Sequence, residues 1–197
     1  MSERAAGPIG VVLGLVLLGA VAAFAIGLPK ATDEGDAEAA EVVLSDELPH
    51  GLVAQDQLEG ADAARYAEAQ DSMVEGLEDI YGDPAAVRGY ASVDGSIQAT
   101  VTVLDRAPGL FDPQGPPIDP KVLGFERSFY ELRRVGDAVC NLYWQQPVPE
   151  GEPVDESADP SGVSCQLGDG DRTLELFGSG LSAEAAVEVL ESLTSGS

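Results

Sequence analysis

Apolar and polar residues alternate in three pairs of segments between residues 87 and 177, with the two-residue period of half-buried β-strands. The pairs are 87–93 with 96–104, 129–135 with 138–144, and 163–167 with 172–177. A glycine-containing dipeptide stands between the members of each pair: Asp94-Gly95, Gly136-Asp137 and Asp169-Gly170. Such dipeptides favour tight turns, so the pattern predicts three β-hairpins and about six strands.

Two segments with the helical spacing of apolar residues flank these strands. The apolar positions of segment 61–81 are Tyr66, Met73, Leu77 and Ile80, with Gly82 directly after its end. The apolar positions of segment 182–193 are Ala183, Ala186, Val187, Leu190 and Leu193. Ser182 is a favourable N-cap for the second helix. The element order therefore predicts one α+β domain, 61–197. Its antiparallel sheet of about six strands is flanked by an N-terminal and a C-terminal helix, both on one face.

The longest apolar stretch lies near the N-terminus and predicts a transmembrane helix at 8–29. Twenty residues from Ile9 to Leu28 are strongly apolar. At about 1.5 Å per residue, this length matches the hydrocarbon core of a bilayer. A cleaved signal peptide is the alternative, because Ala20-Val21-Ala22 and Ala23-Phe24-Ala25 resemble cleavage sites. The apolar run continues past both sites, which favours a retained anchor.

The charges that flank this stretch favour a cytoplasmic tip at 1–7 and a C-terminal domain outside the plasma membrane. Arg4 and the α-amino group precede the span, whereas Lys30 is the last base before Arg65. Small residues stand four positions apart in two groups along the span and are candidates for close helix packing: Gly10 and Gly14, then Gly19, Ala23 and Gly27.

The segment 30–60 is predicted to be a flexible acidic spacer. Residues 31–60 contain nine acids, no lysine or arginine and no aromatic residue. Such a composition is typical of segments that cannot bury a core. Two short apolar groups, at 42–44 and 52–53, are the positions that could dock on the domain or on a partner.

Charge excludes one class of partner. The chain has 35 acidic and 10 basic residues and a net charge of −25. We expect no nucleic-acid partner, because such a domain repels a phosphate backbone. Cationic peptides, basic protein surfaces and divalent cations remain compatible with this charge, which also favours solubility.

The two cysteines, Cys140 and Cys165, are predicted to form a disulfide. Each lies among the apolar positions of its predicted strand, and an even count in an exported domain favours a bond. Two free buried thiols are the alternative. The spacing is not Cys-x-x-Cys, so a redox enzyme is not expected.

Residues with catalytic chemistry are sparse. The one histidine, His50, lies in the predicted spacer, and no cofactor or metal site is indicated. Arg127, Tyr130, Arg133 and Arg134 belong to the one aromatic and basic concentration of the domain. They form a candidate ligand patch; the alternative is that the arginines pair with nearby acids. Gly178-Ser179-Gly180 is a weak candidate anion site before the last helix.

The layout resembles that of uncharacterised single-pass, membrane-anchored envelope proteins of actinobacteria. The resemblance rests on the N-terminal apolar stretch, the acidic spacer, the small disulfide-bearing domain and the closing LSAEAAVEVLESL helix. We therefore expect a non-enzymatic extracytoplasmic binding or accessory domain, with an envelope protein or peptide as partner. The alternatives are an assembly protein that associates through its transmembrane helix and an envelope hydrolase that uses carboxylates.

Overall fold

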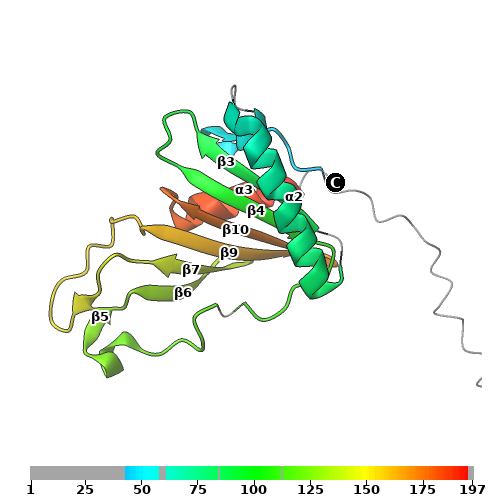
Figure 1. Ribbon diagram of the computed structural model, residues 1–197. Helices are drawn as coiled ribbons and strands as arrows, with labels where there is room; N and C mark the ends of the chain where they lie inside the picture. The colour runs from blue at the N-terminus through cyan, green and yellow to red at the C-terminus, as the bar shows by residue number, and fades with distance from the viewer. Residues whose placement is uncertain (1–42, 58–60, 84, 112, 195–197) are drawn as a thin grey trace, which may run out of the picture. The chain divides into compact units, whose positions relative to one another are not determined.

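The computed structural model describes residues 43–57, 61–83, 85–111 and 113–194 (Figure 1). The long helices are α2 (Ala61–Tyr81) and α3 (Ala183–Thr194), and the 3-10 helices are η1 (Pro49–Gly51), η2 (Gln55–Gln57) and η3 (Pro120–Leu123). The strands of the main sheet are β1 (Glu47–Leu48), β2 (Leu52–Ala54), β3 (Ala85–Ser92), β4 (Gln98–Leu104), β6 (Tyr130–Val135), β7 (Ala138–Tyr143), β9 (Gly162–Asp169) and β10 (Arg172–Ser179). The remaining strands, β5 (Phe125–Arg127) and β8 (Val148–Pro149), form a separate pair.

The main sheet is antiparallel throughout and has the strand order β1-β2-β3-β4-β10-β9-β7-β6. The three predicted hairpins are confirmed as β3–β4, β6–β7 and β9–β10. The first and third hairpins join where β4 pairs with β10, and the second joins through β7 and β9. The α+β class is therefore confirmed, with an eight-stranded sheet in place of the expected six strands.

One face of the sheet, which we call the α3 face, carries the hydrophobic core. The register aligns Val101 with Leu176 and Leu176 with Cys165, so an apolar row crosses the central strands. Helix α3 packs on this face through five buried side chains: Ala183, Ala186, Val187, Val189 and Leu190. The apolar stripe predicted for the C-terminal helix is thus confirmed at four of its five positions, with Leu193 half-buried against the core.

Helix α2 lies on the opposite face, which we call the α2 face, so the expectation that both helices cover one face is wrong. Figure 1 shows α2 in front of the sheet and α3 behind it. The Gly89 N–H of β3 donates a hydrogen bond to Gln70 Oε1 of α2 at 3.0 Å. The sheet residues on this face include Thr100, Thr102 and Glu175. Val87 and Phe177 stand on the same face, so it is mixed in character and offers a helix less apolar area to bury than the α3 face.

The predicted apolar stripe of α2 is largely exposed to solvent. Met73 is 41% exposed and Ile80 is 75% exposed. The half-buried positions are Ala63, Ala67, Gln70, Val74 and Leu77, so Leu77 alone of the predicted stripe is half-buried. The spacing predicted the helix correctly but not the side that packs.

The sheet begins within the predicted spacer, so the boundary at residue 61 and the flexibility expected for 43–57 are wrong. Strands β1 and β2 pair with each other and with β3, and four apolar residues of this stretch are buried: Leu44, Leu48, Leu52 and Ala54. Arg88 of β3 holds the stretch through both carboxylate oxygens of Asp56, at 2.9–3.1 Å, and through Asp46 at 2.7 Å. Burial lowers the pKa of Arg88, but these hydrogen bonds outweigh it and raise the pKa above its ordinary value.

His50 is exposed, but it has a defined place in the fold rather than in a spacer. It lies in η1 with a positive φ of 64°, and its Nε2 is 3.0 Å from Glu188 Oε2 of α3. This contact joins the start of the domain to its last helix.

The predicted tip 1–7, the predicted span 8–29 and the candidate helix-packing residues lie outside the described residues. Those candidates are Gly10, Gly14, Gly19, Ala23 and Gly27. Within the described part of the chain, no helix has the length and apolar character to cross a membrane.

Candidate functional site: a cavity beside the edge strand

A cavity of about 550 Å³ lies beside the edge strand β6, at the N-terminal end of α3. Its walls come from four parts of the chain: strands β5 to β7, the stretch 117–123, the loop 154–160, and Ser182–Glu184 of α3. The last residues of β7 and the start of α3 belong to the α3 face, so the cavity is an opening at the margin of the core. Its volume lies within the range of about 300–1,000 Å³ that is typical of small-molecule and peptide pockets.

Trp144 and Arg127 form the central feature of the cavity wall. The Arg127 guanidinium stacks over the Trp144 ring, 3.6 Å from its centroid. Arg127 also donates from Nη1 to the backbone oxygen of Asp155, at 3.3 Å. Its Nε and the Trp144 Nε1 are buried and have no hydrogen-bond partner among the described residues. Two fixed donors beside an aromatic surface favour a ligand that carries carbonyl or carboxylate oxygens.

Carboxylates outnumber bases around the cavity. Six acids and two bases line it: Asp119, Glu126, Glu131, Glu156, Asp159 and Glu184, with Arg127 and Arg133. Glu131 pairs with Arg133 at 2.9 Å and Glu126 with Lys121 at 3.4 Å. The Gly151 N–H, with support from Lys121, holds the pKa of Glu126 below its ordinary value.

Four of these acids have no ion pair with a base within the described part of the chain, and Asp119, one of them, accepts a hydrogen bond from the Lys121 backbone N–H. Glu156 and Asp159 lie in the loop 154–160, and Glu184 lies in the first turn of α3. The positive end of the helix dipole favours a carboxylate at the position of Glu184. These three exposed carboxylates make their part of the cavity wall negative, which favours a cationic ligand.

The four residues of the predicted ligand patch do not all reach the same place. Arg127, Tyr130 and Arg133 line the cavity, whereas Arg134 is exposed on the opposite face of β6. The register separates Arg134 from Arg133, because Arg133 aligns with Cys140 and Arg134 with Val139 on β7. Tyr130 shares the face of Arg134 but lies at the other end of β6. Arg133 pairs with Glu131, as the alternative interpretation of the arginines expected.

The disulfide between Cys140 and Cys165 is confirmed. The two residues are directly opposite on β7 and β9, and both are fully buried on the α3 face. The bond fixes β7 in the sheet two residues before Leu142, which lines the cavity. A disulfide in such a core is typical of an oxidising, extracytoplasmic compartment.

The glycines before α3 have a packing role that the anion-site interpretation did not include. Gly180 has a φ of +75°, and a Cβ at this position would meet the backbone oxygen of Ser96. The turn therefore needs a residue without a side chain. Ser182 follows as the N-cap, accepting a hydrogen bond from the Ala185 N–H at 3.1 Å, so the expected cap is confirmed.

Sequence reasoning missed Trp144 and the loop 154–160 as parts of the site. Trp144 has the same strand phase as the buried Cys140, so the alternation alone indicates a core position and not a site. The one tryptophan of the chain, standing just after a strand and before a proline-rich acidic loop, was the available signal. The segments 117–123 and 182–184 are far apart in the sequence, and no local pattern indicates that they meet at one cavity.

Comparison with known proteins gives no match to any family model, curated protein or solved structure.

Proposed function

We propose that this protein is a membrane-anchored, extracytoplasmic binding domain without enzymatic activity. In this proposal the cavity beside β6 takes up a peptide or small ligand of the cell envelope. The apolar stretch 8–29 supports the anchor on sequence grounds, and the disulfide supports an oxidising compartment.

The observation that carries the proposal is the Trp144–Arg127 stack inside a pocket of ligand size. Aromatic surfaces and a few oriented polar groups are the features that binding pockets share. Arg127 uses Nη1 for the Asp155 oxygen, and its buried Nε is unpaired among the described residues, so it retains a donor for a ligand.

Trp144 provides the test, because it is the one tryptophan of the chain. The full chain, purified in a neutral detergent, is titrated with pools of random hexapeptides while tryptophan fluorescence and the melting temperature are recorded. We expect at least one pool to change the fluorescence to saturation and to raise the melting temperature. If no pool does either at millimolar concentration, the binding proposal fails.

The compartment is tested separately. A reporter enzyme that is active outside the cytoplasm, fused after Ser197, is expected to be active and to sediment with membranes. N-terminal sequencing of the mature protein should begin at or next to Met1. A start at Ala23 or Ile26 would replace the anchor with a cleaved signal peptide.

A further inference from the structure

The cavity meets the edge of strand β6 rather than one of its faces. Four consecutive residues, Tyr130–Arg133, line it. Successive side chains of a strand point to opposite faces, so four in a row reach one cavity where that cavity runs along the strand's edge.

The outer edge of β6 carries backbone groups that no strand in the described part of the chain pairs with, since β6 ends the sheet order. The Trp144 N–H donates to the Phe129 oxygen at 2.7 Å, and the register continues from this pair. In an antiparallel ladder, alternate residues face the partner. The N–H and C=O groups of Tyr130, Leu132 and Arg134 therefore point outward, away from β7.

An edge strand with unpaired backbone N–H and C=O groups is a template on which another chain can pair. Proteins usually keep such strands short or cover them. The other edge of this sheet is the two-residue strand β1, which offers a template of little length. Strand β6 has six residues and a cavity beside it.

We propose that β6 takes up a basic, extended peptide as an additional antiparallel strand, with alternate peptide side chains entering the cavity. This inference rests on the proposed function and names its ligand class. Main-chain hydrogen bonds to Tyr130, Leu132 and Arg134 supply affinity, and the cavity supplies specificity. Peptide carbonyl groups match the unpaired donors of Arg127 and Trp144.

Charge decides the class of peptide. Glu156, Asp159 and Glu184 line the cavity with exposed side chains, and an added strand would carry its alternate side chains toward them. Lysine or arginine at alternate positions of the peptide therefore meets opposite charge, while acidic peptides are repelled. The net charge of −25 adds long-range attraction for the same class.

The probe is the blocked peptide acetyl-Lys-Val-Lys-Val-Lys-Val-amide, titrated against the full chain in a neutral detergent with Trp144 fluorescence as the readout. Two further peptides carry N-methyl groups, one on the lysines and the other on the valines. In an added strand, one set of N–H groups faces β6 and the other faces solvent. We expect one N-methylated peptide to bind at least about tenfold more weakly, because about 1.4 kcal/mol corresponds to tenfold, and the other to bind like the parent.

Protein variants test the same geometry. Leu132→Pro removes an outward N–H and leaves the β6–β7 ladder intact, and edge strands tolerate such a proline. We expect this variant to bind the lysine-valine peptide about tenfold more weakly. Its circular dichroism spectrum should show that the sheet is retained. If this variant does not fold, the N-methylated peptides carry the test alone.

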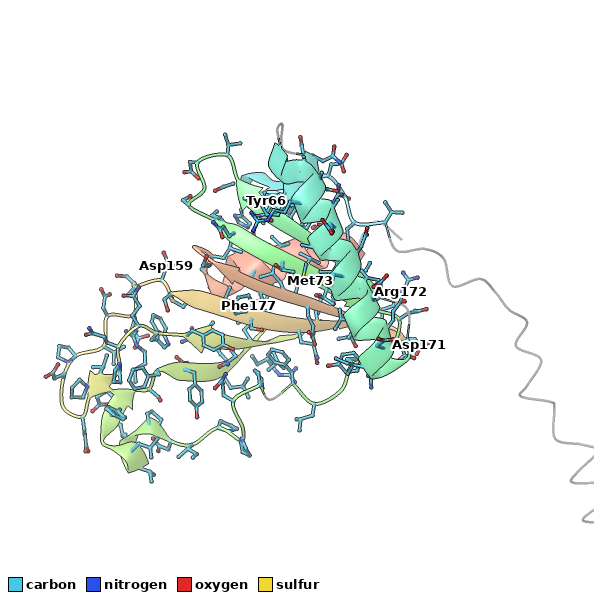
Figure 2. All side chains as sticks on the ribbon, in the orientation of Figure 1. Tyr66, Met73, Asp159, Asp171, Arg172 and Phe177 are labelled. Atoms are coloured by element: carbon cyan, nitrogen blue, oxygen red, sulfur yellow. A yellow bond between two sulfur atoms is a disulfide. The ribbon has the colours of Figure 1, made fainter. Side chains whose placement is uncertain are left out.

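Asp159→Asn tests the charge, with Asp171→Asn as its matched control. Both carboxylates are exposed, and Figure 2 shows them at opposite ends of the sheet. We expect Asp159→Asn to lower the affinity for the lysine-valine peptide by about threefold, because exposed ion pairs contribute up to about 1 kcal/mol. We expect Asp171→Asn to leave this affinity unchanged.

The outcomes separate the two proposals. Equal binding of the two N-methylated peptides, or equal binding of a glutamate-valine peptide, overturns the strand addition and leaves the proposed function standing. If another hexapeptide pool binds saturably but the lysine-valine peptide does not bind, the strand addition is likewise overturned and the proposed function stands. Edge-to-edge dimerisation through β6, seen by analytical ultracentrifugation and abolished by Leu132→Pro, would also overturn the strand addition.

Discussion

Helices α2 and α3 contact the same sheet, but they make very different contributions to the core. Helix α3 buries five residues on the apolar α3 face. Helix α2 is nearly twice as long, yet its apolar side chains Tyr66, Met73 and Ile80 are exposed, and it contacts the mixed α2 face at β3 (Figure 2). The comparison shows that a helix buries most where its own apolar stripe meets an apolar face of the sheet.

The largest expected effect concerns the disulfide on the α3 face. Replacing both cysteines, Cys140→Ala with Cys165→Ala, removes a bond across a sequence separation of 25 residues. Chain-entropy reasoning for this loop gives a loss of about 3.5 kcal/mol in the free energy of unfolding, measured by urea denaturation. A loss below about 1 kcal/mol would show that the face does not depend on the bond.

The next effect compares the two helices directly. Leu190→Ala on α3 truncates a fully buried side chain and is expected to cost about 3 kcal/mol. Met73→Ala on α2 is expected to change stability by less than about 0.5 kcal/mol, because the side chain is 41% exposed. Equal losses in the two variants would contradict the comparison.

A smaller effect is expected at alkaline pH, from Tyr90 on the α3 face. Burial raises the pKa of Tyr90 to about 12, against the opposing influence of Arg88. Between about pH 10 and 12, Tyr90 therefore keeps its proton in the folded state and loses it in the unfolded state. The stabilisation is therefore present below pH 10 and decreases between about pH 10 and 12, by about 2 kcal/mol.

Tyr90→Phe is the control for this prediction. The variant keeps the buried ring, loses the hydrogen bond from the hydroxyl group to the Ser45 oxygen, and has no proton to release. Its urea midpoint should decline less than that of the parent between pH 10 and 12. The same decline in both proteins would assign the alkaline instability to other groups.

The smallest effect concerns the α2 face, where Asn141 is buried with both amide atoms unpaired among the described residues. An unpaired buried amide costs free energy that an apolar side chain of similar size does not. We expect Asn141→Leu to stabilise the domain by about 1 kcal/mol, read as a rise in melting temperature. A loss of stability would show that the amide has a structural role.

Local patterns predicted the parts of the fold that depend on neighbouring residues. The three hairpins followed from glycine-containing turns between alternating segments, and Ser182 marked the start of α3. The disulfide followed from the phase of two strands, since Cys140 and Cys165 each lay on an apolar face. Each of these features follows from a pattern within a single strand, turn or helix start.

The features that sequence reasoning missed depend on contacts between distant residues. The stretch 43–57 has an acidic composition, yet Arg88 of β3 neutralises Asp46 and Asp56 while the leucines around them enter the core. The cavity is likewise assembled from β6, the loop 154–160 and the start of α3. An average over composition cannot show which charges a single arginine pairs with.

Hydrogen exchange of the backbone amides tests the comparison of the two helices most directly. If the α3 face carries the cooperative core, the amides of α3 near Leu190 and of the central strands should exchange only through global unfolding. The amides of α2 near Val74 should exchange at least about tenfold faster, through local opening that leaves the sheet intact. Exchange of α2 as slow as that of α3 would contradict the account.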